Sequence, residues 1–172
     1  NKNVGAVGGK VILINKRTID PDFFLNTPIP IADPLTKALG YIFLDVKNGP
    51  RYAEYLTPFF MIRKEAIERI RYDTSYKATA FREESDLHEQ IKRLGYKLIL
   101  DPNVYVYHIS IEHGGNRTED KESTRIYWKA RNHTKFIIKW RCQSLKTWYL
   151  FTTALLLTLY RPWHTHEILK GI

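Results

Sequence analysis

The sequence FREESDLHEQIKRLGYKLILDPNVYVYH, residues 81–108, contains a helical pattern followed by two short apolar runs. A helix is expected from Glu83 to Leu94, because apolar residues recur there every three or four positions, and Gly95 follows as a stop signal. The runs YKLIL and VYVYH flank Asp-Pro-Asn, which predicts two strands joined by a turn. The stretch closes on His108, at the end of a half-buried strand, where side chains emerge into clefts.

The expected helix begins with three carboxylates in four positions, Glu83, Glu84 and Asp86. One interpretation is a solvated first turn, since the helix dipole favours negative charge there. In the other, neighbouring carboxylates divide the work: one is held as an anchor and another accepts a proton. Glu83 and Asp86 are spaced to share a face of the helix. In this second interpretation the pair caps backbone N–H groups while Glu84 points into a cleft.

The composition is that of a basic, packed protein. The chain carries 27 lysines and arginines against 18 acidic residues, a net charge of +9. Such an excess suggests an anionic partner: nucleic acid, a phosphorylated small molecule or an acidic membrane surface. The single cysteine, Cys142, excludes an intramolecular disulfide and favours a reducing compartment. Residues 1–20 lack the pattern of a signal peptide, so a cytoplasmic location is expected.

Composition and periodicity place the remaining elements. Residues 4–16 are rich in valine and isoleucine and predict a strand, and residues 55–62 predict a buried strand. A short helix is expected at residues 63–70 and a long one with a basic outer face at residues 119–140. Residues 20–50 contain five prolines and predict a long loop or several short pieces.

Residues 144–163 are the most apolar segment of the chain. Their uninterrupted apolar part is shorter than the roughly 20 residues that a membrane span needs. Tryptophans and basic residues bracket it, as in a segment that lies in the lipid interface, and a buried terminal helix is equally compatible. We therefore divide the chain into residues 1–143, the main domain, and residues 144–172, a C-terminal helical segment.

The order of these features resembles the second half of a family-two glycosyltransferase of the A-type fold. That family has an acidic pair, Asp-Leu two residues later, a helix ending in Gly-Tyr, a proline turn and a strand ending in His, all matched in residues 81–108. The sequences FFMIRKEAIERIRYDTSY (59–76) and WKARNHTKFIIK (128–139) are similar to other segments of the family. The resemblance spans about residues 4–140. It implies the α/β class: a partial A-type glycosyltransferase fold, with a short mixed sheet, packed helices and C-terminal helices.

Carried over residue by residue, the resemblance makes Glu83 and Glu84 the catalytic pair, with Glu84 as the base. It places His108 near the metal ion and the donor diphosphate. The positions that it assigns to substrate binding lie in the first helical turn and in a loop that covers the diphosphate: Asp86, Gly114, Gly115 and Arg117. Asp73 matches a motif position that we interpret as structural.

The implied reaction is inverting transfer of a sugar from a nucleotide-sugar donor to a hydroxyl of a saccharide or lipid-linked acceptor. A divalent cation, Mg²⁺ or Mn²⁺, is expected with the amino-terminal half of the family, whose Asp-x-Asp motif binds it. Residues 1–143 begin about where that half would end, so they correspond to the acceptor-side half. We therefore expect this chain alone to be inactive, and the complete enzyme to work in peripheral contact with the cytoplasmic face of a membrane.

An alternative is a basic module without enzymatic activity that binds nucleic acid or an anionic membrane. Residues 127–141 mix aromatic and basic side chains, which such binding uses. No known nucleic-acid motif is present, however, and a basic outer helix face is usually only solvated. Nucleic acid is therefore the less expected partner.

Overall fold

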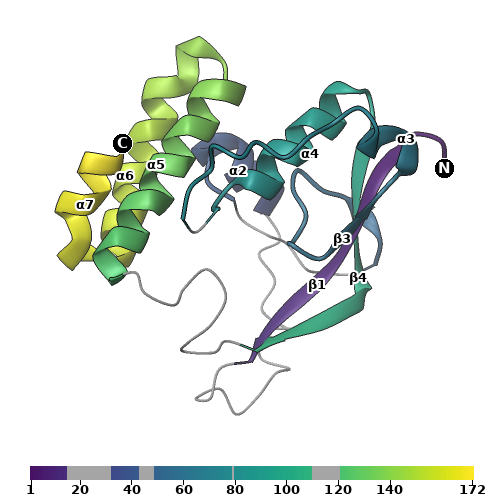
Figure 1. The fold of residues 1–172 in the computed structure, drawn as a ribbon, viewed down its shortest axis with the longest axis horizontal. Helices are drawn as coiled ribbons and strands as arrows, with labels where there is room; N and C mark the ends of the chain where they lie inside the picture. Colours follow the sequence, from purple (N-terminus) through teal and green to yellow (C-terminus); the bar gives the residue numbers. More distant parts are fainter. Residues whose placement is uncertain (15–31, 43–48, 79, 110–120) are drawn as a thin grey trace. The chain divides into compact units, whose positions relative to one another are not determined.

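A computed structural model of the 172-residue chain gives the fold (Figure 1). It describes residues 1–14, 32–42, 49–78, 80–109 and 121–172. Within these ranges the chain contains six α-helices and four β-strands, and the strands form one mixed sheet. The α/β class that we expected is confirmed.

The chain forms two compact units. The first comprises residues 1–36, 42–71 and 87–111, and the second comprises residues 37–41, 72–86 and 112–172. The functional division of the chain after residue 143 stays a prediction.

The sheet belongs to the first unit and has the strand order β2–β4–β1–β3. Its strands are β1 (Val4–Ile14), β2 (Arg51–Tyr52), β3 (Phe60–Ile62) and β4 (Lys97–Ile109). The two long strands, β1 and β4, lie side by side and run parallel (Figure 1). The short strands pair antiparallel, β2 with β4 and β3 with β1. The strand expected at the start of the chain is confirmed as β1.

β4 is a single strand where the sequence predicts two strands and a turn. Its pairing with β1 passes from Leu100 opposite Gly8 to Tyr105 opposite Lys10, so residues 101–104 bulge out of the ladder. The predicted turn is therefore wrong. The Asp-Pro-Asn sequence interrupts the pairing without reversing the chain, because both of its flanks pair with the same neighbouring strand.

The segment before α4 is less regular than the sequence suggests. The strand expected at residues 55–62 is reduced to β3, although Tyr55, Leu56 and Thr57 are buried. The helix expected at residues 63–70 is a single short turn, α3 (Lys64–Ile67). The side chain of Arg63 fixes its start, because Nε donates to the carbonyl of Val4 over 2.6 Å.

α4 (Glu83–Arg93) agrees with its expected bounds to within one residue. Leu87 and Ile91 pack against residues of β1 and β4 in the core of the first unit. Gly5 permits the close approach, since a Cβ there would lie 2.5 Å from the side chain of Ile91. Gly95 follows the helix with a φ of +87°, which glycine adopts readily, and so confirms the expected stop.

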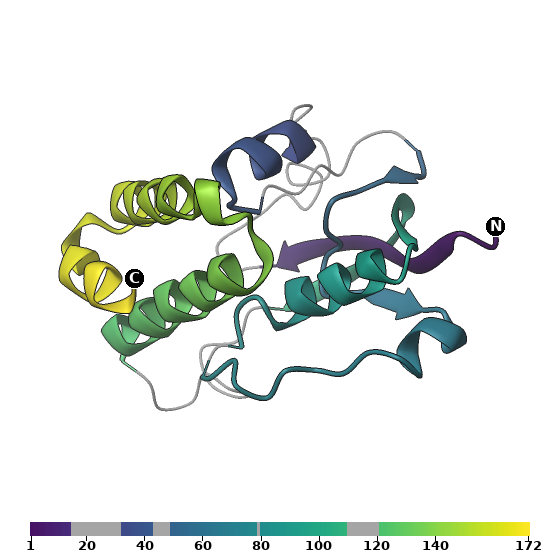
Figure 2. The same cartoon turned by 90° about the horizontal axis from the view of Figure 1, so that it is seen from above.

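The second unit is mainly helical. α5 (Glu122–Trp140), α6 (Lys146–Tyr160) and α7 (Thr165–Gly171) pack against one another (Figures 1 and 2). Their shared core consists of Ile126, Ala130, Leu157 and Ile168. α5 confirms the long helix expected from the sequence.

A further helix, α2 (Ala32–Leu39), lies within the proline-rich region and is one of its expected short pieces. Carbonyl groups at its C-terminal end accept hydrogen bonds from α6. The hydroxyl of Tyr149 donates to the carbonyl of Lys37 over 3.0 Å, and that of Thr152 donates to the carbonyl of Leu39 over 2.8 Å. These bonds satisfy carbonyls that a helix end leaves without intrahelical partners.

α6 exposes its more apolar face. Its buried residues are Tyr149, Thr152, Thr153 and Leu157. Its exposed large apolar residues are Trp148, Phe151, Leu155, Leu159 and Tyr160. Across the ranges that the structure describes, none of the helices combines the length and the hydropathy that crossing a membrane requires.

Candidate functional site

A buried arginine fixes the backbone immediately before the acidic turn of α4. Arg82 has a φ of +80°, a left-handed conformation that costs a non-glycine residue about 1–3 kcal/mol. Its Nε donates to Nδ1 of His133, and its Nη2 donates to the carbonyl of Gly40, each over 2.9 Å. The guanidinium carbon lies 4.7 Å from the centre of the Phe136 ring. These contacts position the chain that leads into Glu83.

His133 takes part as a neutral imidazole. Its burial, followed by the charge of Arg82, holds its pKa well below the usual range. A neutral ring has one nitrogen without a proton, and Nδ1 can therefore accept the hydrogen bond from Arg82. His133, the hydrogen-bond partner of Arg82, thus stays uncharged at physiological pH.

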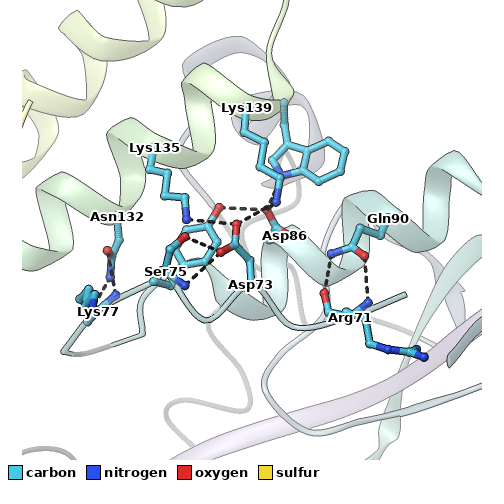
Figure 3. Close-up of polar contacts among 11 residues, drawn as sticks. Arg71, Asp73, Ser75, Lys77, Asp86, Gln90, Asn132, Lys135 and Lys139 are labelled. Atoms are coloured by element: carbon cyan, nitrogen blue, oxygen red, sulfur yellow. Dashed lines mark hydrogen bonds and ion pairs between the residues drawn. The ribbon is translucent and has the colours of Figure 1, made fainter. Parts of the chain in front are cut away.

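Asp86 is the anchored carboxylate of the acidic turn (Figure 3). Its side chain is 0% exposed, and Oδ1 accepts hydrogen bonds from the hydroxyl of Tyr76 over 3.0 Å and from Nε1 of Trp140 over 2.6 Å. The ammonium group of Lys139 forms an ion pair with the same oxygen at 2.8 Å. Burial, and next the charge of Asp86, raise the pKa of Tyr76, so its hydroxyl remains a donor.

Asp73 belongs to the same cluster of polar contacts (Figure 3). Its Oδ2 lies 3.0 Å from the ammonium groups of both Lys135 and Lys139, and its Oδ1 accepts from the N–H and hydroxyl of Ser75. Burial raises the pKa of Asp73, but these hydrogen bonds outweigh it and hold the pKa well below the usual range. Burial lowers the pKa of Lys139, but its hydrogen bonds to Asp86 and Asp73 outweigh this effect, so the pKa is raised above its ordinary value. The structural role that we assigned to Asp73 agrees with these contacts.

Glu83 and Glu84 lie in a different environment. Both are partly buried, and no cation among the described residues forms an ion pair with either. Burial raises the pKa of Glu84, partly offset by a hydrogen bond from its own backbone N–H. Burial, followed by the charge of Glu84, also raises the pKa of Glu83. Burial and then these two carboxylates raise the pKa of the nearby Tyr72.

The three carboxylates therefore lie in different environments, but not in the arrangement that we expected. Asp86 is anchored by side chains of the second unit, whereas we expected it to cap the helix with Glu83. A backbone N–H contact belongs instead to Glu84. The catalytic assignments of Glu84 and Glu83 and the substrate-binding assignment of Asp86 stay predictions.

The remaining predicted site residues fall on parts of the chain that are not described. His108 is the penultimate residue of β4 and is opposite Leu13 of β1, but its side chain lies outside the described residues. Gly114, Gly115 and Arg117 lie within residues 110–120, also outside them. The expectation that these four residues share a site with Glu84 stays a prediction.

The predicted metal site is equally untested. Within the described ranges, no group of three or more His, Cys, Asp or Glu side chains is arranged to hold a metal ion. The chain contains the Asp-x-Asp sequence Asp20–Pro21–Asp22, which lies outside the described residues. Binding of Mg²⁺ or Mn²⁺ stays a prediction.

Three residues of the site received no site role from the sequence: Tyr72, Lys139 and Trp140. The spacing of Lys135 and Lys139 places them on the same face of α5, which indicates a pair of cations available to one acidic partner. Nothing in that spacing identifies the partner. The contact between Trp140 and Asp86 joins positions far apart in the chain, so no local sequence pattern indicates it.

Comparisons with known proteins return no match. The sequence matches no protein-family model, no curated protein and no solved structure. Any functional assignment therefore depends on the residues described above and on the resemblance of their order to a family.

Proposed function

We propose that this chain is the acceptor-side half of an inverting glycosyltransferase. The reaction moves a sugar from a nucleotide-sugar donor to a hydroxyl of a saccharide or lipid-linked acceptor. The first support is the order of motifs in residues 59–139, which resembles family-two glycosyltransferases of the A-type fold. The second is the environment of Glu84.

The observation that carries the proposal is the contrast between Glu84 and Asp86 on one helical turn. Asp86 is fully buried and receives three donors, one of them the ammonium group of Lys139. Glu84 is partly buried, has a raised pKa and has no cationic partner among the described residues. Carboxylates that share a site but differ in environment commonly take different catalytic roles. Glu84 is thus the better proton acceptor.

In the proposed reaction, Glu84 accepts the proton of the acceptor hydroxyl as the hydroxyl oxygen attacks the anomeric carbon. The new carbon–oxygen bond forms while the bond to the donor diphosphate breaks, and the diphosphate leaves with the bonding electrons. Burial makes the carboxylate more basic and so favours proton transfer near neutral pH. Asp86 and Arg82 hold the helix start in place without contacting the reacting atoms.

The exposed face of α6 supports a membrane location for this reaction. Trp148, Phe151, Leu155 and Leu159 follow the spacing of one helix face, and each is at least 46% exposed. Aromatic and basic side chains at the ends of such a face are typical of helices that lie in the lipid interface. The net charge of +9 favours an anionic membrane surface. A lipid-linked acceptor would be available there.

A transfer assay on the protein that carries this chain tests the proposal. Transfer from a panel of nucleotide-sugar donors should fall by about 10²–10⁴-fold in Glu84→Gln, because general-base catalysis contributes about that factor. Glu68→Gln is the matched control, since it makes the same change at an exposed glutamate outside the acidic turn, and it should lose less than about twofold. Wild-type turnover in Glu84→Gln, or equal losses in both variants, contradicts the role of Glu84.

The basic binding module is the weaker candidate. Two of its lysines, Lys135 and Lys139, are engaged by Asp73 in the second unit. A salt-dependent gel shift with mixed nucleic acids separates the two functions. Retardation at physiological salt, together with no sugar transfer by the complete protein, favours the binding module.

A further inference from the structure

A pocket on α5 lies beside the cluster around Asp73. It has a volume of about 580 Å³, within the usual range for small-molecule sites. Its walls come from α5 and from the segment that precedes α4, all within the second unit. The lining residues are Ser75, Lys77, Trp128, Arg131, Asn132, Thr134, Lys135, Ile138 and Lys139. Four of these side chains are cationic.

The charges around the pocket do not cancel. The carboxylates of Asp73 and Asp86 compensate two positive charges through their contacts with Lys135 and Lys139. Lys77 and Arg131 have no acidic partner among the described residues. The pocket therefore keeps an excess of two positive charges, which matches the charge of a phosphate monoester or of one end of a diphosphate.

One part of the pocket wall, the backbone of Lys77, is held in place by a buried amide. The side-chain amide of Asn132, a residue that is 2% exposed, forms two hydrogen bonds with the backbone of Lys77. Its Nδ2 donates to the carbonyl over 2.9 Å, and its Oδ1 accepts the N–H over 3.4 Å. The backbone of Lys77 is thereby held at Asn132, the neighbour of Arg131 on α5.

A second observation points to a ligand. Thr134 is 2% exposed and lines the pocket, and its hydroxyl has no hydrogen-bond partner among the described residues. A buried hydroxyl without a partner is unfavourable, and a ligand oxygen in the pocket would supply one. Trp128 adds an aromatic surface beside the cations. The pocket thus combines charge, an unused hydroxyl and an apolar wall.

We propose that this pocket binds a phosphate group of a small ligand, with Arg131 and Lys77 as the principal cations and the Thr134 hydroxyl as a hydrogen-bond partner. The phosphate belongs either to a free diphosphate compound or to a phospholipid-type head group, which share this chemistry. The inference goes beyond the proposed glycosyl transfer. Its test uses no transferase activity, so either proposal can fail without the other.

The test is an NMR titration of the chain labelled with ¹⁵N-tryptophan, using inorganic pyrophosphate and, separately, glycerol 3-phosphate at low ionic strength. The indole signal of Trp128, assigned with Trp128→Phe, should shift saturably, while that of the exposed Trp163 should not. Arg131→Gln and Lys77→Gln should each weaken binding by about tenfold or more, since a charge-assisted hydrogen bond is lost. Thr134→Val should weaken it too. The tighter of the two probes identifies the source of the phosphate.

The matched control is Arg69→Gln, which removes the same charge from an exposed residue outside the pocket lining. It should leave the affinity unchanged to within about twofold. Lys77 and Arg131 are both exposed, so their variants should fold, and circular dichroism checks this. The proposal is overturned if neither probe shifts Trp128, or if Arg69→Gln weakens binding as much as Arg131→Gln does.

Discussion

Asp86 receives most of the polar contacts around the acidic turn of α4. The sequence placed it correctly in the first turn of a helix but could not show that its environment differs from that of Glu84. What separates them is Trp140 and Lys139, which come from a helix more than fifty positions later. A local pattern carries no information about such partners. The different environments of adjacent carboxylates therefore follow from the tertiary packing alone.

Asp86→Ala should lower the free energy of unfolding by about 2–3 kcal/mol, because it leaves the buried hydroxyl of Tyr76 and the indole N–H of Trp140 without their acceptor. The comparison variant is Asp73→Ala, which breaks ion pairs that are one-quarter exposed or more and should lose about 1 kcal/mol. Urea denaturation at pH 7 measures both. Equal losses in the two variants contradict the anchoring role of Asp86.

His88 is a buried imidazole whose two ring nitrogens have no hydrogen-bond partner among the described residues. Burial, followed by the charge of Lys92, lowers its pKa to about 3. The unfolded chain binds this proton near pH 6.5, so stability falls as the pH falls from about 6.5 towards 3. Between pH 7 and pH 5 the contribution of this residue is about 2 kcal/mol.

His88→Leu should therefore be as stable as the wild type or more so at pH 7, since it removes unpartnered polar atoms. It should also lose about 2 kcal/mol less than the wild type between pH 7 and pH 5. Urea denaturation at both pH values measures this. An unchanged pH dependence in His88→Leu excludes the assigned pKa.

Among the elements, the helices follow the sequence more closely than the strands. The periodic apolar residues of α4 and α5 fix their positions, because each helix buries one face. The strands depend on pairing that periodicity does not show: β4 continues through Asp-Pro-Asn as a bulge, and β3 keeps only three residues. Both errors concern where hydrogen-bond partners lie, which short turn signals do not determine.

Gly9→Ala should weaken the pairing of β1 with β4. A Cβ at this position would clash with the carbonyl oxygen of Val104 and lie 3.0 Å from the ring of Phe59. Because backbone atoms cannot move aside as a flexible side chain does, the free energy of unfolding should fall by about 1–3 kcal/mol. Lys10→Ala, at the next position of the strand, should lose less than about 1 kcal/mol. Thermal denaturation of both variants measures the difference.

The exposed face of α6 should mediate membrane binding. The double variant Phe151→Ser/Leu159→Ser should reduce cosedimentation with phosphatidylcholine–phosphatidylglycerol vesicles by about tenfold or more, since burying each side chain contributes about 1.5–3 kcal/mol. Its stability should change little, because both residues are exposed. Leu169→Ser, on the exposed side of α7, is the control and should bind as the wild type does. Unchanged binding of the double variant excludes α6 as the contact.

At the scale of the whole molecule, the sequence predicted the α/β class and the position of the acidic turn. It could not predict that the boundary between the two units falls inside α4, after Asp86. Nor could it show the pocket on α5, which requires the segment around Lys77 to lie beside that helix. His108 and Arg117 stay predictions from the family resemblance. The functional proposal thus depends most on the chemistry of Glu84.

The pKa of Glu84 is the measurement that tests this chemistry most directly. A ¹³C NMR titration of the glutamate side-chain carboxyls in this chain, with Glu84→Gln to assign the signal, reports it without any donor or acceptor. We predict a value above the 4.5 of an unperturbed glutamate, because burial disfavours the charged form. A value at or below 4.5 contradicts the claim that this carboxylate is set up to accept a proton.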